Sequence, residues 1–142
     1  MNFKLTIGVF LFSLLAGCSI SQTVSPVGAD LVVGEVCVID NVRVRPGFMQ
    51  AMQSSMQQRG IQSKVMPPNS PITVCPLTMT YTASWNWDMA LYLRVADMRV
   101  YRNGVLVGSA AYDSTRGGGR LDKFVDAEKK VNELIGQLFP VR

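Results

Sequence analysis

The sequence predicts an α+β domain: an antiparallel or mixed sheet of about five strands with two helices packed on one face. Three observations lead to this fold class. Apolar residues occupy every odd position from Leu77 to Val95, which is typical of strands that bury one face. Asn103-Gly104 between apolar residues is a strong hairpin signal. Two segments, 46–59 and 122–138, carry apolar residues three and four positions apart, as amphipathic helices do.

The length and composition set the size of the domain. With 142 residues, 48% of them apolar and 17% charged, the chain has room for one core and is too apolar for a disordered protein. The elements are expected in the order strand, helix, strand, strand, strand, strand, helix.

The first strand is expected over 33–39, where valines and Cys37 form a largely apolar run. Pro46 is well placed in the first turn of the following helix, and Gly60 supplies its stop. A second strand over 61–66 ends at a proline-rich segment. We expect the apolar stripe of this helix to lie in the core; it consists of Phe48, Met49, Met52 and Met56.

Three antiparallel strands are expected in the next segment. The alternation from Leu77 to Val95 is longer than one strand of about 5 to 6 residues, so a turn is expected near Asn86 to Asp88. A shift of phase after Val95 suggests a β-bulge, and Asn103-Gly104 closes the second hairpin.

The segment Arg116-Gly-Gly-Gly-Arg120 is expected to join the last strand to an amphipathic helix that ends before Pro140. Asp122 is the expected N-cap of this helix, because its carboxylate can accept a hydrogen bond from a free backbone N–H.

The N-terminus has the features of a lipoprotein signal peptide, residues 1–17. Lys4 precedes an uncharged run of thirteen residues, 5–17, which is shorter than the roughly 20 residues that span a bilayer. The run ends in Leu15-Ala16-Gly17-Cys18, which resembles a bacterial lipobox. The resemblance implies cleavage after Gly17 and a covalent lipid on Cys18. No other cofactor is expected.

The mature chain is expected to begin with a lipidated N-terminus and flexible tether, 18–33, rich in small and polar residues. A single periplasmic α+β domain, 34–142, follows it. Ser19 stands where many lipoproteins retained in the inner membrane carry Asp, which favours the periplasmic face of the outer membrane.

Cys37 and Cys75 then remain as an even pair in an oxidising compartment, which favours a disulfide. The alternative is a reactive or metal-binding pair, but the chain has no histidine to complete a metal site.

No catalytic residue and no metal ligand are predicted, so the protein is not expected to be an enzyme. Histidine is absent, and no nucleophile motif is found. Carboxylate catalysis is the remaining route, but each Asp stands at a strand end, turn or helix start; these residues are Asp40, Asp88, Asp97, Asp113 and Asp122. A net charge of +4 without a basic cluster argues against nucleic acid as a partner.

Two sets of residues are candidates for binding. Trp85 and Trp87 share one strand face and fit the core register, yet paired indoles also stack on sugars or lie at membrane surfaces. Arg116 and Arg120 flank the glycine run before a helix N-terminus, where an anion is stabilised. The simpler reading of that segment is a structural connection.

The chain resembles a family of small proteobacterial envelope lipoproteins of uncharacterised function. The motifs that carry the resemblance are Cys-Val-Ile-Asp-Asn at 37–41, Arg-Pro-Gly-Phe at 45–48, Cys-Pro-Leu-Thr at 75–78, Trp-Asn-Trp-Asp at 85–88 and Arg-Gly-Gly-Gly-Arg-Leu-Asp-Lys-Phe at 116–124. The resemblance implies an envelope location and this fold, and it carries over no activity.

Two functions follow as hypotheses. The first is a membrane-anchored module without enzymatic activity that binds another envelope component, protein or glycan, through its sheet edge or the surface around Trp85 to Asp88. The second is a lipoprotein that binds a small ligand or anion through Arg116, Arg120 and the helix N-terminus.

Overall fold

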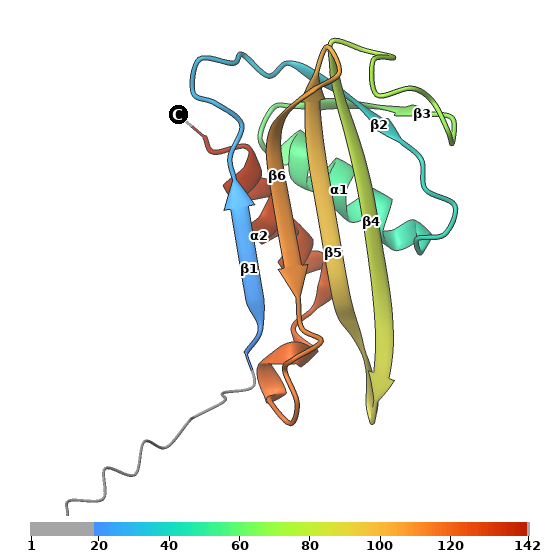
Figure 1. Ribbon diagram of the computed structural model, residues 1–142, viewed down its shortest axis with the longest axis vertical. Helices are drawn as coiled ribbons and strands as arrows, with labels where there is room; N and C mark the ends of the chain where they lie inside the picture. The colour runs from blue at the N-terminus through green and yellow to red at the C-terminus, as the bar shows by residue number, and fades with distance from the viewer. Residues whose placement is uncertain (1–18, 142) are drawn as a thin grey trace, which may run out of the picture.

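A computed structural model describes residues 19–141 as one six-stranded mixed sheet with two α-helices on one face (Figure 1). The sheet order is β1-β6-β5-β4-β2-β3. The elements are β1 (Ser21–Ser25), β2 (Glu35–Ile39), α1 (Pro46–Gln58), β3 (Gln62–Met66), β4 (Leu77–Asp88), β5 (Ala90–Arg102), β6 (Val105–Asp113), the 3-10 helix η1 (Leu121–Phe124) and α2 (Ala127–Leu138). The predicted α+β class is confirmed, with one strand more than expected.

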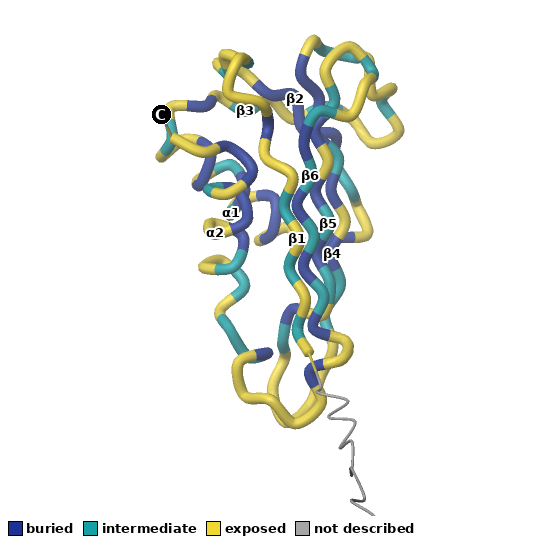
Figure 2. Tube along the Cα trace, turned by 60° about the vertical axis from the view of Figure 1, so that its left-hand side comes forward, coloured by how far each residue is buried: buried dark blue, intermediate teal, exposed yellow. Residues whose placement is uncertain are grey.

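The core lies between the sheet and the helix pair. Figure 2 shows the buried residues gathered along the side of the sheet that faces α1 and α2. The methionines of α1 are part of this core, as predicted, since Met52 and Met56 are fully buried. They share it with Met79 of β4 and Met98 of β5. A flexible, unbranched side chain fills irregular gaps between a helix and a twisted sheet.

The meander β4-β5-β6 follows the predicted pattern closely. Its first turn centres on Met89, whose φ of 60° is left-handed, one residue past the expected position. Ser84 lies opposite Val95 but Trp85 lies opposite Leu93, so Arg94 is the extra residue of a bulge immediately before the predicted shift of phase. The second turn has positive φ at both Asn103 and Gly104, as a type I′ hairpin requires.

The flexible tether expected over 18–33 is wrong for the part that the structure describes. Ser21–Ser25 forms β1, an edge strand paired antiparallel with β6. Beyond it, Val27 is buried, and its N–H donates to the carbonyl of Leu138 at 2.9 Å. The polar composition of this segment suggested a flexible tether, but an edge strand with one covered face also needs few apolar residues.

Close contact with this segment explains a glycine in β6. A Cβ atom at Gly108 would lie 2.7 Å from a methyl carbon of Val27 and 3.2 Å from its backbone nitrogen. The chain before β2 therefore packs against the sheet at a distance that only glycine permits.

The predicted disulfide is present between Cys37 and Cys75, whose Cα atoms are 6.1 Å apart. It joins β2 to the irregular segment before β4, which contains several prolines and no strand between Met66 and Leu77. The signal peptide and Cys18 lie outside the described residues. Over 19–141, neither helix has the length and hydropathy needed to cross a bilayer.

Replacing both Cys37 and Cys75 by Ala should lower the free energy of unfolding by about 4 kcal/mol, since the bond restrains a long loop of the unfolded chain. Denaturant titration of the oxidised protein and the double variant measures this difference. Reduction of the parent protein should reproduce it, and an unchanged transition would contradict a structural role for the bond.

Candidate functional site

The structure separates the two tryptophans that the sequence placed together. Trp85 is partly buried against the core: its ring meets Phe48 edge-on at a centroid distance of 5.9 Å, and the Arg45 guanidinium lies 5.5 Å from its ring centroid. Trp87, two residues further along β4, is 70% exposed. The core interpretation holds in part for Trp85 and is wrong for Trp87.

The β4-β5 hairpin projects beyond the rest of the sheet, which exposes its end (Figure 1). We call residues Trp87–Leu91 the hairpin tip. Trp87 lies opposite Leu91 in the strand register, and Met89 stands at the turn between them. Met89 is 89% and Leu91 49% exposed. Three large apolar side chains at this tip are therefore in contact with solvent.

The base of the tip is held by the segment 114–126, which we call the glycine loop. Lys123 is buried, and its Nζ atom donates to Asp88 Oδ2 at 2.5 Å and to the Gly118 carbonyl at 2.6 Å. The same ammonium lies 5.1 Å from the ring centroid of Tyr92, which meets Phe124 edge-on. A buried ammonium needs such partners, and they fix the loop to the hairpin.

Hydrogen bonds also order the start of the glycine loop. The Ser114 hydroxyl donates to the carbonyls of Leu93 and Arg94 at the bulge of β5, and Asp113 accepts from the Thr115 N–H at 2.7 Å. Hydrogen bonds from Thr115 lower the pKa of the Asp113 carboxyl, and the charges of Arg94 and Arg116 lower it further. The loop is therefore a structured connection, as the simpler reading of the sequence expected.

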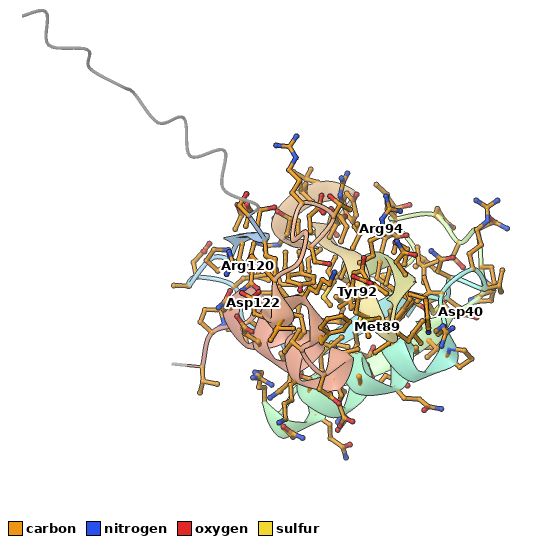
Figure 3. All side chains as sticks on the ribbon, turned by 90° about the horizontal axis from the view of Figure 1, so that it is seen from below. Asp40, Met89, Tyr92, Arg94, Arg120 and Asp122 are labelled. Carbon is orange, nitrogen blue, oxygen red and sulfur yellow. A yellow bond between two sulfur atoms is a disulfide. The ribbon has the colours of Figure 1, made fainter. Side chains whose placement is uncertain are left out.

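The two arginines of the glycine run do not form the anion cradle of the alternative hypothesis. Arg120 donates to the Asp122 carboxylate from Nε at 2.9 Å and from Nη2, and this pairing lowers the pKa of Asp122. Arg116 is exposed and acts electrostatically on Asp113. In Figure 3, which looks onto this end, Arg120 and Asp122 lie side by side, away from Met89, Tyr92 and Arg94.

The N-terminus of the last helix is closed by a residue other than the one predicted. Asp122 belongs to η1, and α2 begins only at Ala127. Asp126 is the N-cap, and its Oδ1 accepts from the Lys129 N–H at 3.0 Å. Both aspartates precede an apolar periodic stretch, so the sequence pattern did not distinguish them. The N–H group that an anion would use is already occupied by this carboxylate.

The five aspartates considered for catalysis each have a structural partner. Asp88 binds Lys123, Asp122 binds Arg120, and Asp113 accepts from Thr115. Asp97 pairs with Arg99 at 2.9 Å, and Asp40 accepts from the Tyr81 hydroxyl at 3.2 Å. Burial raises the pKa of Tyr81, and the charge of Asp40 adds to this. Figure 3 shows Asp40 on the opposite side of the molecule from the Arg120–Asp122 pair.

Two clefts of the molecule have none of these five aspartates in their lining. One, of about 350 Å³, lies where the starts of α1 and α2 meet β4, and it is lined by Arg45, Phe48, Trp85 and Val131 among others. The other, of about 320 Å³, is lined mainly by apolar residues of 27–33 together with Ile61 and Phe139. Among residues 19–141, no three side chains of the metal-ligating types come together in a group that could hold a metal ion.

The sequence prediction missed the exposure of Met89, Leu91 and Leu121. The first two continue the apolar alternation of the buried strands, so the pattern alone placed them in the core. Only the lengths of the strands, 12 and 13 residues for β4 and β5 against 9 for β6, show that the hairpin extends past its neighbours.

Comparisons with known proteins give a fold and no family. Neither a protein-family model nor a curated protein matches the chain. Among solved structures, the PelC dodecamer from Paraburkholderia phytofirmans is similar with a TM-score of 0.56 and 10% identity, over 84% of this chain and 94% of that one. A single-substitution variant of that dodecamer has a TM-score of 0.53 and 13% identity over the same shares.

A minor lipoprotein from Acinetobacter baumannii is also similar, with a TM-score of 0.41 and 11% identity over 76% of this chain and 92% of that one. That superposition is too weak to argue from. At these identities, the PelC structures establish only a similarity of fold.

Asp126→Ala should lower the free energy of unfolding by about 1 kcal/mol, because the variant leaves an N–H of the first turn of α2 without its acceptor. Asp122→Ala is the matched control and should change it much less, since Asp122 makes an exposed ion pair. Denaturant titration of both variants measures the difference. A larger loss for Asp122→Ala would show that the helix is capped as the sequence first predicted.

Proposed function

We propose that this protein is a lipid-anchored module of the bacterial envelope, without enzymatic activity, that binds another envelope component through an open edge of its sheet. The lipobox-like Leu15-Ala16-Gly17-Cys18 supports the anchor, and Ser19 supports the periplasmic face of the outer membrane. The single observation that carries the binding function is the position of β3 at the end of the strand order.

β3 forms one of the two edges of the sheet. It pairs in parallel with β2 on one side, and its other side faces no strand of the described chain. Val65 of this strand is 46% exposed. At the opposite edge, Gln22 of β1 donates to Glu133 and Gln137 of α2, so a helix partly covers that strand. An edge strand with free backbone groups can accept an added strand from a partner.

The chemistry of the side chains supports a role in binding over a role in catalysis. The chain has no histidine, and each of the five candidate aspartates has a structural partner such as Lys123, Arg99 or Tyr81. A general acid or base has to be free to exchange a proton with a substrate.

Self-assembly is a second candidate for the edge. The similar PelC structure is a dodecamer, so the fold is compatible with packing into a closed assembly. The occupant of β3 is then a further copy of this chain.

The anion-binding alternative is less well supported by the geometry. Arg120 is engaged with Asp122, and Asp126 caps the helix whose N-terminus an anion would need. Of the two arginines in this hypothesis only Arg116 is left for an anion, and one arginine of the pair is a weak anion site.

A photo-crosslinking residue in place of Val65 should capture the partner in intact cells, because Val65 is exposed on the edge strand. The same residue in place of Val42, which is 76% exposed between β2 and α1, is the matched control and should capture little. Mass spectrometry of the Val65 adduct distinguishes another envelope component from a second copy of the chain. Equal capture from both positions, or none from Val65, would contradict binding through β3.

A further inference from the structure

The strand register shows at which end of the sheet the chain enters β1 from the side of Cys18. Ser21 lies opposite Asp113, Asp113 opposite Val95, and Val95 opposite Ser84. Since β1, β6, β5 and β4 alternate in direction, the chain before Ser21 continues toward the same end as the β4-β5 turn. Figure 1 shows the start of β1, the glycine loop and the hairpin tip together at this end.

The link between the fold and Cys18 is short. Ile20 is partly buried, and its side chain lies 3.4 Å from the place that a Cβ atom at Gly117 would take. Only Ser19 separates Ile20 from Cys18 in the sequence. With about 3.8 Å between consecutive Cα atoms, Cys18 lies within about 11 Å of Ser21. The hairpin tip extends five residues past Ser84, or about 17 Å at 3.3 Å per residue.

An acyl chain on Cys18 would therefore hold this end of the sheet against the lipid surface, and the hairpin tip is long enough to reach that surface. The side chains that meet the surface are apolar: Trp87, Met89 and Leu91 of the tip, with Leu121 of η1, which is 82% exposed. Tryptophan is enriched where a membrane meets water, because its ring is apolar and its N–H is polar.

Two arginine side chains at this end are accessible to the phosphate groups of phospholipids. Lys123 is paired with Asp88, and Arg120 with Asp122. Arg94 and Arg116 are exposed and both act on Asp113, so two guanidinium groups at this end are accessible from solvent. A guanidinium can bind a phosphate through two hydrogen bonds.

From this arrangement we infer that the hairpin tip and Leu121 insert into the boundary between the headgroups and the acyl chains of the membrane that holds the lipid anchor. The protein is then held at two points, by the acyl chains on Cys18 and by Trp87, Met89 and Leu91. Two points of attachment fix the tilt of the sheet and set the direction in which the β3 edge faces. The inference rests on the proposed lipidation of Cys18.

Quenching of tryptophan fluorescence tests the inference on the full lipidated protein. The Trp85→Phe variant leaves Trp87 as the only indole. It is reconstituted in phosphatidylethanolamine–phosphatidylglycerol vesicles with and without brominated acyl chains. Trp87 should lose most of its emission in the brominated vesicles, because the quencher acts only on rings that reach the acyl region.

The matched control carries the indole at the opposite end of the sheet. Leu106 follows the β5-β6 turn and is 52% exposed, so Leu106→Trp combined with Trp85→Phe and Trp87→Phe presents a similar probe away from the anchor. Its emission should be unaffected by bromination. Circular dichroism and melting of both variants check that the fold is kept.

Labelling of Cys18 with a fatty-acid analogue in cells, with Cys18→Ser as the negative control, separates the two proposals. A labelled protein whose Trp87 is not quenched, or is quenched no more than the probe at position 106, overturns insertion of the tip and leaves the anchored module intact. Absence of the label from the parent protein overturns the anchor, and the tip inference with it.

Discussion

The pairing of β1 with β6 is the constraint on which the rest of this account depends. Five residues, Ser21–Ser25, attach the chain next to Cys18 to the edge of the sheet, and Val27 then packs beside Gly108 and donates to Leu138. Without this pairing, a flexible segment would connect the domain to the proposed anchor, and the orientation of the domain relative to the membrane would not be fixed. With it, the strand register determines which end of the sheet lies nearest to the proposed anchor.

Much of the fold could be predicted because most of its elements have a local physical signature. Asn103-Gly104 specifies its turn by backbone conformation, and the methionine spacing of α1 specifies a buried face. β1 could not be predicted in this way. Its sequence, Ser-Gln-Thr-Val-Ser, is stabilised by hydrogen bonds to β6 and by contacts of Gln22 with α2, more than 100 residues away in the chain. When a strand is stabilised mainly by distant partners, its own short polar sequence shows no recognisable strand pattern.

The candidate site was harder to predict for a related reason. Alternation shows which face of a strand is apolar, but it does not show how far the covering helices reach along that face. Trp85 meets Phe48 and is covered, whereas Trp87 lies beyond the helices and is exposed. In the glycine loop, Asp122 and Asp126 both fit the pattern of a helix cap, but Asp122 lies inside the 3-10 helix η1 and Asp126 directly precedes α2. The tertiary arrangement thus exposes Trp87, which the pattern placed in the core, and puts a capping carboxylate where the alternative hypothesis needed a free helix N-terminus.

Hydrogen exchange at the backbone amides of β1 tests the central claim most directly. The account predicts that the amides of Ser21–Ser25 that face β6 exchange slowly in the lipidated, vesicle-bound protein, at rates similar to those of the neighbouring amides of β6. Exchange at the rate of an unstructured peptide throughout 21–25, while β4 and β5 stay protected, would show that the segment is a tether. The orientation inferred for the domain would then have no structural basis.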